Sequence, residues 1–407
     1  MYDLYLIPLT HSKNYFTNGL TDDDISTLGI DYLYFNKMFN EPDLQLNLPS
    51  RVVHNPTEKY LFPIRIDIIM NKLNVSTYLK NFRFTLPDNV VTDIKNNRCK
   101  LLFDLSLETY MVLSTTYQTA LERLILKTMK RYNLQKSDVI LITGNYASVQ
   151  SNNFMVAIYN WWNTLIKPCT QEFFNLQESL TLSESHRNKK ILNFMRKERP
   201  PRMQLAYFVY LNNLRDHNIV TCGKNVQSIF WQNTVDMYPD QPFLDSLPWE
   251  YDTKLRIPHI DGLMATTDAE RLAYTETYIN CVVEGTARYV ENHLEITEKL
   301  FKPIAHLQPF FVVAQPGVLA YLKGMGFKTF NHLWNEDYDL HGSDQDRFDA
   351  CTALYKKLSL TSHSDLAKMA KEAWPTVEHN YYTYVDYINS GKSTQHLLKT
   401  INESFDK

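Results

Sequence analysis

The sequence predicts an α/β protein with more than one domain. Residues 100–105 and 138–143 have the continuous apolar character of strands that are buried in a parallel sheet. Between them, residues 117–132 carry apolar side chains at the three- and four-residue spacing of a helix. This strand, helix, strand order is the repeating unit of a doubly wound sheet. Because 407 residues exceed one typical domain, two domains are expected.

The domain limits follow from a change in composition near the middle of the chain. Residues 175–188 are polar and end in Ser-Glu-Ser-His-Arg-Asn, so this stretch is expected to be an exposed linker. An N-terminal α/β domain of residues 1–180 is therefore expected to precede a C-terminal α/β domain of residues 188–376. Residues 377–407 have helical apolar spacing in their last part, and this tail is expected to pack back on the first domain.

The second domain is also predicted to alternate strands and helices. Apolar runs predict strands at residues 191–195, 278–283 and 310–314, and amphipathic spacing predicts a helix at residues 203–214. A second α/β layer is therefore expected.

Charge and cysteine content exclude several classes of protein. The net charge of −3 provides no global basic field that would steer the chain towards nucleic acid, although a local basic patch could still serve. The N-terminus has an acid at position 3 and reads as a strand rather than a signal peptide, and no window of 18 uninterrupted apolar residues is present. Five cysteines lie far apart without metal-binding spacing, which disfavours a disulfide framework or a zinc site: Cys99, Cys169, Cys222, Cys281 and Cys351. A soluble protein of a reducing, cytoplasmic compartment is expected.

The most informative motif is Thr297-Glu298-Lys299. Residues 293–296 read as a short strand, and Thr297 is suited to cap a helix that opens with Glu298 and Lys299. A helix start offers free backbone N–H groups and a positive dipole end, both of which favour an anion. Lys299 is then a point charge for a phosphate, and Glu298 can accept hydrogen bonds from sugar hydroxyls. The alternative is a solvated Glu-Lys pair in a first helical turn.

Two further segments carry charged residues at predicted strand ends. Arg196, Arg199 and Arg202 follow the strand at residues 191–195, where bidentate guanidinium groups are suited to a diphosphate, although a solvated turn is the alternative. Glu284 follows the strand that ends at residue 283. A carboxylate there is suited to ribose or sugar hydroxyls, and the alternative role is a helix cap.

These segments together resemble a known family. The Thr-Glu-Lys motif is followed by an apolar helix, a Pro and a hydrophobic strand, then by Gly317 and a Gly-Phe-Lys-Thr-Phe segment at residues 326–330. Glu284 stands upstream after its own strand, and an Arg-rich segment at residues 195–202 opens the same domain, with Met195 and Pro201 in place of the family's Asn and His. Over roughly residues 190–346 this order resembles the fucosyltransferase-like group of GT-B glycosyltransferases, especially those of phages and large viruses.

The resemblance implies both a fold and a function. GT-B enzymes consist of two Rossmann-like domains that face each other across a cleft, and they move a sugar from a nucleotide diphosphate sugar to an acceptor hydroxyl. For this chain, the resemblance implies that the donor is bound by Arg196, Arg202, Glu284, Thr297, Glu298 and Lys299. No cofactor or metal is expected beyond the nucleotide sugar. The acceptor is expected to be a glycan or a hydroxymethylated base of DNA, with the host cytoplasm as the location if the chain is encoded by a phage.

The general base of an inverting transfer is expected in the first domain. Such an enzyme needs a group that takes the proton of the acceptor hydroxyl. Glu108 is the first candidate and Asp104 the second, because both flank the end of the strand at residues 100–105. His11, in the loop after the first strand, is the third candidate. Each is also suited to a purely structural role as a loop or capping residue.

One other function stays open, and two further interpretations are disfavoured. Met195 and Pro201 depart from the family pattern, so a non-catalytic nucleotide-sugar or partner-binding protein with the same fold is the alternative function. The acidic Asp337-Tyr338-Asp339 segment lacks a preceding apolar strand, so a solvated turn is expected there rather than a metal site. A dinucleotide-dependent oxidoreductase is disfavoured, since no GxGxxG motif follows a predicted strand.

Overall fold

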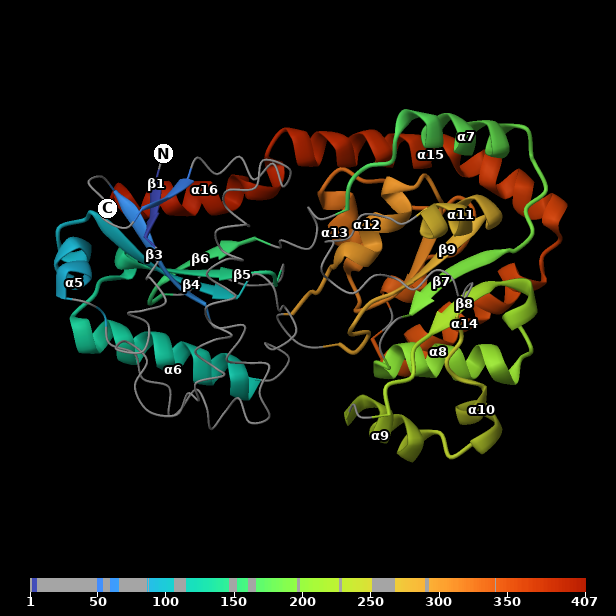
Figure 1. Cartoon of the computed structure of the whole chain (residues 1–407), viewed down its shortest axis with the longest axis horizontal. Coiled ribbons are helices and arrows are strands. Elements are labelled where there is room, and N and C mark those ends of the chain that lie inside the picture. Colours follow the sequence, from blue (N-terminus) through green and yellow to red (C-terminus); the bar gives the residue numbers. More distant parts are fainter. Residues whose placement is uncertain are drawn as a thin grey trace. The chain divides into compact units, whose positions relative to one another are not determined.

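The structure consists of two compact units (Figure 1). The computed structural model describes residues 2–5, 50–53, 59–65, 86, 88–105, 115–145, 152–159, 166–195, 198–226, 229–250, 268–289, 293–340 and 342–407. The first unit comprises Met1–Thr164 together with Tyr387–Lys407, and the second comprises Leu165–Asp386. Each unit is described below by itself.

The first unit is built on a parallel sheet. Its described strands have the order β2-β1-β3-β4-β5-β6, and every neighbouring pair is parallel. Parallel strands that are covered on both faces are expected to be continuously apolar, as in the Val-Ile-Leu-Ile-Thr sequence of β5. The strands are β1 (Tyr2–Tyr5), β2 (Ser50–Val53), β3 (Tyr60–Arg65), β4 (Cys99–Leu105), β5 (Val139–Thr143) and β6 (Met155–Ile158).

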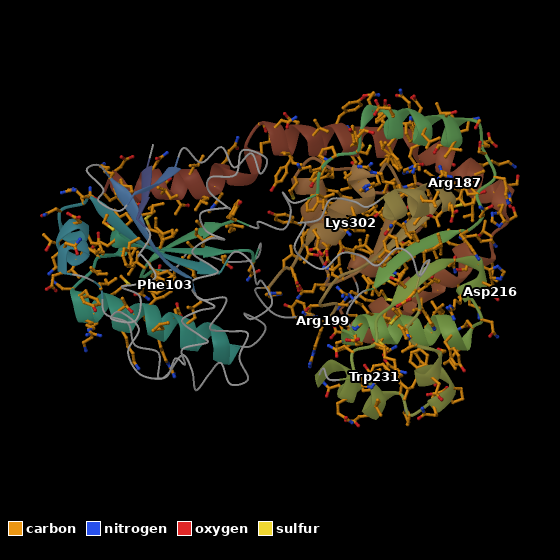
Figure 2. All side chains as sticks on the ribbon, viewed as in Figure 1. Phe103, Arg187, Arg199, Asp216, Trp231 and Lys302 are labelled. Atoms are coloured by element: carbon orange, nitrogen blue, oxygen red, sulfur yellow. The ribbon has the colours of Figure 1, made fainter. Side chains whose placement is uncertain are left out.

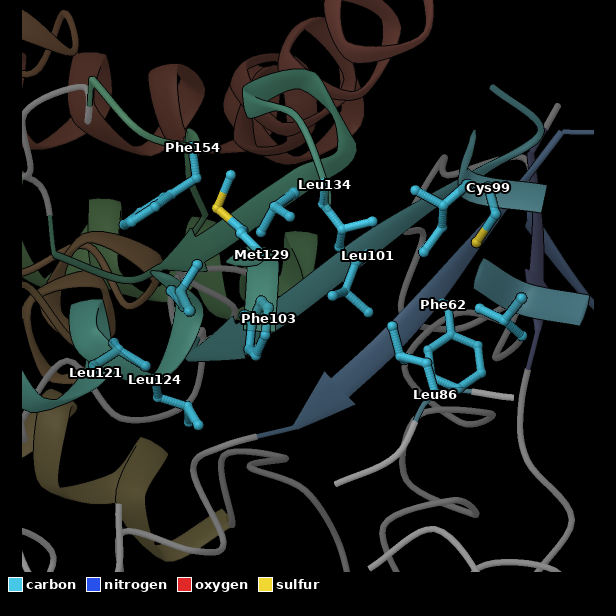
Figure 3. Packing of buried hydrophobic residues seen from close by; sticks show 14 of the residues in the cluster. Phe62, Leu86, Cys99, Leu101, Phe103, Leu121, Leu124, Met129, Leu134 and Phe154 are labelled. Carbon is cyan, nitrogen blue, oxygen red and sulfur yellow. The ribbon is translucent and has the colours of Figure 1, made fainter. Parts of the chain in front are cut away.

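Side chains of β4 show how the two faces of this sheet are covered. Cys99, Leu101 and Phe103 alternate along the strand and pack in one apolar cluster with α5 (Asp88–Lys95) and α6 (Thr115–Tyr132) (Figure 3). The intervening Lys100 lies on the opposite face, where its Nζ is 5.5 Å from the ring centre of Phe405. Phe405 belongs to α16 (Lys392–Phe405), so the C-terminal helix covers the face that α5 and α6 leave open (Figure 1).

The second unit contains another parallel sheet. Its described strands have the order β10-β9-β7-β8, and all are parallel: β7 (Ile191–Met195), β8 (Ile219–Cys222), β9 (Ile279–Val283) and β10 (Phe310–Val313). Helix α8 (Pro200–Leu211) lies on one side of the sheet, and α11 (Asp268–Glu276) and α12 (Glu298–Ala305) lie on the other (Figure 1). The remaining described α-helices of this unit are α7 (Gln171–Leu182), α9 (Ile229–Met237), α10 (Gln241–Ser246), α13 (Val318–Gly324), α14 (Asp344–Leu360) and α15 (His363–Asn389), of which the residues from Tyr387 belong to the first unit.

Residues 175–188 are not an interdomain linker, because they lie within the second unit, although most of them are exposed as expected. Helix α7 occupies residues up to Leu182, and Arg187 is buried just beyond it. The Arg187 guanidinium donates to the carbonyl oxygens of Tyr274 (3.0 Å) and Thr277 (2.6 Å) and to the side chains of Gln177 (3.1 Å) and Thr181 (3.0 Å). The polar composition did not mark a domain boundary, because its buried arginine bonds to groups of the same unit.

The α/β class is confirmed in both units by the parallel sheets and the helices that cover them. The arrangement of the two units across a cleft stays a prediction. All five cysteines are buried and free. Within the described ranges, no helix combines the length and apolar character needed to cross a bilayer.

Candidate functional site

The direction in which the chain adds strands to the sheet of the second unit reverses between β7 and β9. The chain runs from β7 to β8 on one side and then continues with β9 on the other side of β7. The ladder between β7 and β9 ends at the pair Leu192 and Asn280; beyond it, the Asn193 amide bridges the strands by donating to the Cys281 carbonyl at 2.7 Å. Ligands of open parallel sheets bind at the carboxyl ends of the strands at such a switch point. Residues that follow β7 and β9 are therefore the candidates for ligand binding.

Glu284 follows β9 directly and is fully enclosed. Its Oε1 accepts a hydrogen bond from the backbone N–H of Thr297 at 3.0 Å, and its Oε2 accepts one from the Thr297 hydroxyl at 2.6 Å. Thr297 is the N-cap of α12, with the extended backbone that an N-cap requires. The carboxylate at the end of β9 therefore fixes the start of the next helix.

Lys299 lies in the first turn of α12 and is the accessible cation of this cluster. Its Nζ lies 2.8 Å from Thr297 Oγ1, 3.0 Å from Glu298 Oε1 and 3.8 Å from Glu284 Oε2. Side-chain exposure separates the three charged groups: 25% for Lys299, 14% for Glu298 and none for Glu284. Lys299 is thus the most accessible of these three charged side chains, while Glu284 is closed off.

Arg202 approaches the same carboxylates from the other strand. It lies in the first turn of α8, where Arg199 is the N-cap and Pro200 and Pro201 supply backbone angles suited to a helix start. Figure 2 marks Arg199 at the start of α8. Burial lowers the pKa of the Arg202 guanidinium, and the negative charge of Glu284 is the largest opposing influence. The two helix starts that follow β7 and β9 therefore share one electrostatic cluster.

The two carboxylates beside Lys299 differ in their ionisation. Burial raises the pKa of Glu284, and the charge of Lys299 opposes this increase only in part. Burial also acts to raise the pKa of Glu298, but the charge of Lys299 and its hydrogen bond outweigh it, so the pKa of Glu298 is lowered. Glu298 is therefore the more readily ionised of the two partners of Lys299, while both oxygens of Glu284 serve as buried acceptors for Thr297.

Sequence reasoning missed the polar residues that support this helix start. Gln315, which follows β10, accepts hydrogen bonds at its Oε1 from the Glu295 backbone N–H (2.9 Å) and lies 3.0 Å from His293 Nδ1, and its amide donates to the Arg288 carbonyl (3.1 Å). His293 and Glu295 are both buried. The sequence signal was available, since His293, Glu295 and Thr297 recur at every second position before the helix.

The strand expected at residues 293–296 is absent from the described structure. This segment is irregular, with no ladder partner, and the side chain of Gln315 takes the Glu295 N–H that a neighbouring strand would otherwise accept. The expectation of a strand was therefore wrong, although the helix and its N-cap begin at the residues that the sequence indicated.

The other candidate residues lie apart from this cluster or outside the described ranges. Arg196 follows β7 but lies outside the described residues, as do Glu108 and His11. Asp104 is in β4 of the first unit, in register with Ile142 of β5. The roles assigned to these residues stay predictions.

The Asp337-Tyr338-Asp339 segment is not a solvated turn. Asp339 is buried, and its carboxylate accepts the N–H groups of Leu319 and Ala320, each at 3.2 Å, which satisfies the first turn of α13. The expectation was wrong for this residue because its partners are distant in sequence. Across the described ranges, no group of three or more His, Cys, Asp or Glu residues is placed to hold a metal ion.

Comparisons with known proteins gave only distant similarities. No family model and no curated protein matches the sequence. Among solved structures, that of trehalose-6-phosphate from E. coli bound with UDP-2-fluoro glucose shares 10% identity over 83% of this chain and 74% of that chain, with a TM-score of 0.36. The N-terminal domain of Candida albicans trehalose-6-phosphate phosphatase shares 8% identity (95% and 78% covered, TM-score 0.39), and an apo structure of OtsA shares 11% (92% and 79%, TM-score 0.35). The function proposed below rests on residues of the chain itself.

Proposed function

We propose that the chain is a glycosyltransferase that moves a sugar from a nucleotide diphosphate sugar to an acceptor hydroxyl, with inversion and without a metal ion. The observation that carries this proposal is the accessible Lys299 ammonium in the first turn of α12, beside the switch point of a parallel sheet. A cation at a helix start is suited to a diphosphate, because the free N–H groups and the helix dipole add to its charge.

The donor is proposed to bind between the starts of α12 and α8. Lys299 would hold the diphosphate, and the partly exposed carboxylate of Glu298 would accept hydrogen bonds from sugar hydroxyls. Arg202 would add positive charge from the start of α8. Arg196, between β7 and α8 in the sequence, is the second arginine proposed to contact phosphate.

Catalysis is proposed to divide between two domains of GT-B type. The leaving diphosphate would be stabilised by these cations and by the start of α12, which removes the need for a metal ion. Glu108, with Asp104 and His11 as the alternatives, would take the proton of the acceptor hydroxyl. The resemblance to the phage and viral group makes a hydroxymethylated base of DNA or a glycan the proposed acceptor.

A non-catalytic nucleotide-sugar or partner-binding protein is the second candidate. The observation in its favour is the departure of Met195 and Pro201 from the family pattern. Incubation with a panel of sugar nucleotides separates the two candidates. Release of nucleoside diphosphate, by transfer or by hydrolysis, excludes the pure binding protein, and binding without release over long incubation excludes the enzyme.

The central test is the substitution Lys299→Ala. Loss of a charge-assisted contact to phosphate is expected to cost about 2 to 3 kcal/mol, or roughly 30- to 150-fold in nucleoside diphosphate affinity. The variant is expected to melt within a few degrees of the unmodified chain, because Glu284 keeps both of its hydrogen bonds from Thr297.

Calorimetric titration with UDP and with GDP, beside a thermal melt, measures both effects. Lys302→Ala is the matched control, since Lys302 lies in the last turn of the same helix (Figure 2). It is expected to bind nucleotide as the unmodified chain does. Unchanged affinity of a folded Lys299→Ala variant would mean that Thr297-Glu298-Lys299 is only a helix start.

A further inference from the structure

We propose that Glu284 is a positioning residue that aims the Lys299 ammonium through the Thr297 hydroxyl and does not itself touch the ligand. This inference rests on the proposed nucleotide-binding function and assigns separate roles within that site. Glu284 is fully enclosed, and each of its oxygens already accepts a hydrogen bond from Thr297. A ribose or sugar hydroxyl would have to open this enclosure to reach it.

The direction of the hydrogen bonds defines the role of the hydroxyl. An ionised carboxylate can only accept, so the single hydroxyl proton of Thr297 points to Glu284 Oε2, at 2.6 Å. The lone pairs of Thr297 Oγ1 then face the Lys299 ammonium, at 2.8 Å, and the Lys299 backbone N–H, at 3.4 Å. Glu284 thereby turns the hydroxyl into an acceptor for Lys299.

Charge reinforces the same geometry. Glu284 Oε2 lies 3.8 Å from Lys299 Nζ, close enough for an ion pair but beyond direct hydrogen-bond distance. The carboxylate therefore attracts the ammonium towards the hydroxyl, while Glu298 holds it from the exposed side at 3.0 Å. Of these two carboxylates, only Glu298 is partly exposed, so an incoming phosphate would displace Glu298 from Lys299 and leave Glu284 in place.

The substitution Glu284→Gln keeps the size of the side chain and reverses one of its two hydrogen bonds, the one with the Thr297 hydroxyl. The amide oxygen must accept the Thr297 backbone N–H, so the amide NH₂ faces the Thr297 hydroxyl and donates to it. The hydroxyl proton of Thr297 then finds no acceptor on residue 284. It turns away and competes with the ammonium of Lys299 for the same space. Lys299 loses a well-aimed acceptor and the nearby negative charge, and nucleoside diphosphate affinity is expected to fall roughly tenfold.

Conservative replacement of Thr297 tests whether its hydroxyl links Glu284 to Lys299. Thr297→Ser keeps the hydroxyl and is expected to bind UDP or GDP within about threefold of the unmodified chain. Thr297→Val keeps the shape and removes the hydroxyl, so it is expected to weaken binding roughly tenfold, as Glu284→Gln does. Equal losses of nucleotide affinity in Thr297→Ser and Thr297→Val would overturn this link through the hydroxyl.

Glu336 provides a matched control for loss of a buried carboxylate. Its oxygens accept from the Thr329 hydroxyl at 2.6 Å and from the Phe330 N–H at 2.7 Å, and Lys323 Nζ lies 3.7 Å away. The arrangement copies that of Glu284 but follows α13 instead of a strand at the switch point. Glu336→Gln is expected to lower the melting temperature by an amount similar to Glu284→Gln while leaving nucleotide affinity unchanged.

The deciding experiment is a double-substitution cycle of Glu284→Gln and Lys299→Met, with affinity for UDP or GDP measured by calorimetry on the full chain. If Glu284 acts through Lys299, Glu284→Gln weakens binding roughly tenfold alone and has no further effect in the Lys299→Met background. Additive losses would show direct contact between Glu284 and ligand and would overturn the positioning role. Normal binding by Glu284→Gln beside weak binding by Lys299→Met would overturn this inference alone. Normal binding by every variant, Lys299→Met included, would overturn the proposed function together with it.

Discussion

The imidazole of His306 stacks on the ring of Tyr274, with ring centroids 4.4 Å apart and planes 11° apart. His306 is enclosed in the second unit, and its Nδ1 lies 2.7 Å from the carbonyl oxygen of Lys302, to which it donates. Burial lowers the pKa of His306 to about 3, and the positive charges of Lys302 and Arg271 act in the same direction, against the hydrogen bond to the Lys302 carbonyl. The folded chain therefore holds His306 in its neutral form.

We expect His306 to reduce stability as the pH falls below its ordinary pKa of about 6.5. The unfolded chain takes up a proton on this histidine below that pH and the folded chain does not, so acidification favours unfolding until the pH reaches about 3. The free energy of unfolding should drop by about 2 kcal/mol from this group between pH 7 and pH 5. Urea unfolding at both pH values measures the drop.

The matched variants are His306→Gln and His332→Gln. His306→Gln removes the buried titrating ring, so its loss of stability between pH 7 and pH 5 should be smaller than that of the unmodified chain. His332 is exposed, and its replacement should leave the pH dependence as it is. The same pH dependence in both variants would contradict the assignment to His306.

A buried ion pair in the first unit leads to a second prediction. Lys100 Nζ lies 3.2 Å from Asp138 Oδ1, and Lys100 is 1% exposed. Asp138→Asn leaves the Lys100 charge buried without its counter-ion and should destabilise the chain by about 3 kcal/mol. The double variant Lys100→Met with Asp138→Asn removes that charge and should recover most of the loss. Thermal melts of the single and double variants check this, and a double variant as unstable as Asp138→Asn would count against it.

Glu108→Gln is expected to lower turnover at least about 100-fold while nucleotide affinity stays unchanged, because a general base acts on the acceptor in the transition state. Single-turnover rates beside calorimetric titration separate these effects. Glu122→Gln, on α6, serves as the control and should turn over normally. Normal turnover by Glu108→Gln would transfer the role to Asp104 or His11. Normal turnover after replacement of Glu108, Asp104 and His11 in turn would remove the base from this part of the chain.

Transfer activity is expected to survive EDTA, because the cations at the starts of α8 and α12 would neutralise the leaving diphosphate in place of a metal ion. Assays with and without EDTA, followed by addition of Mg²⁺ or Mn²⁺, check this. Activity that disappears in EDTA and returns with either ion would contradict the prediction.

Several features of the fold could be read from the sequence because their causes are local. Continuous apolar runs identified β4, β5 and β10 within one or two residues, and the Thr297 N-cap identified the start of α12. Apolar runs and caps act over a few neighbouring residues, so their signal lies within a short window. Residues 175–188 were wrongly taken as an interdomain linker for the opposite reason: the carbonyl groups that accept hydrogen bonds from the buried Arg187 lie about 90 positions further along.

The sequence alone determined that a carboxylate and a lysine lie at a strand end and a helix start, because both positions follow from neighbouring residues. Only the tertiary structure decided that Glu284 is enclosed and that Glu298 is partly exposed. Glu284 and Thr297 are 13 positions apart, and Gln315 reaches Glu295 across 20 positions. Burial and hydrogen-bond direction depend on packing between β9, β10 and α12, and packing between distant segments leaves no periodic pattern in the chain.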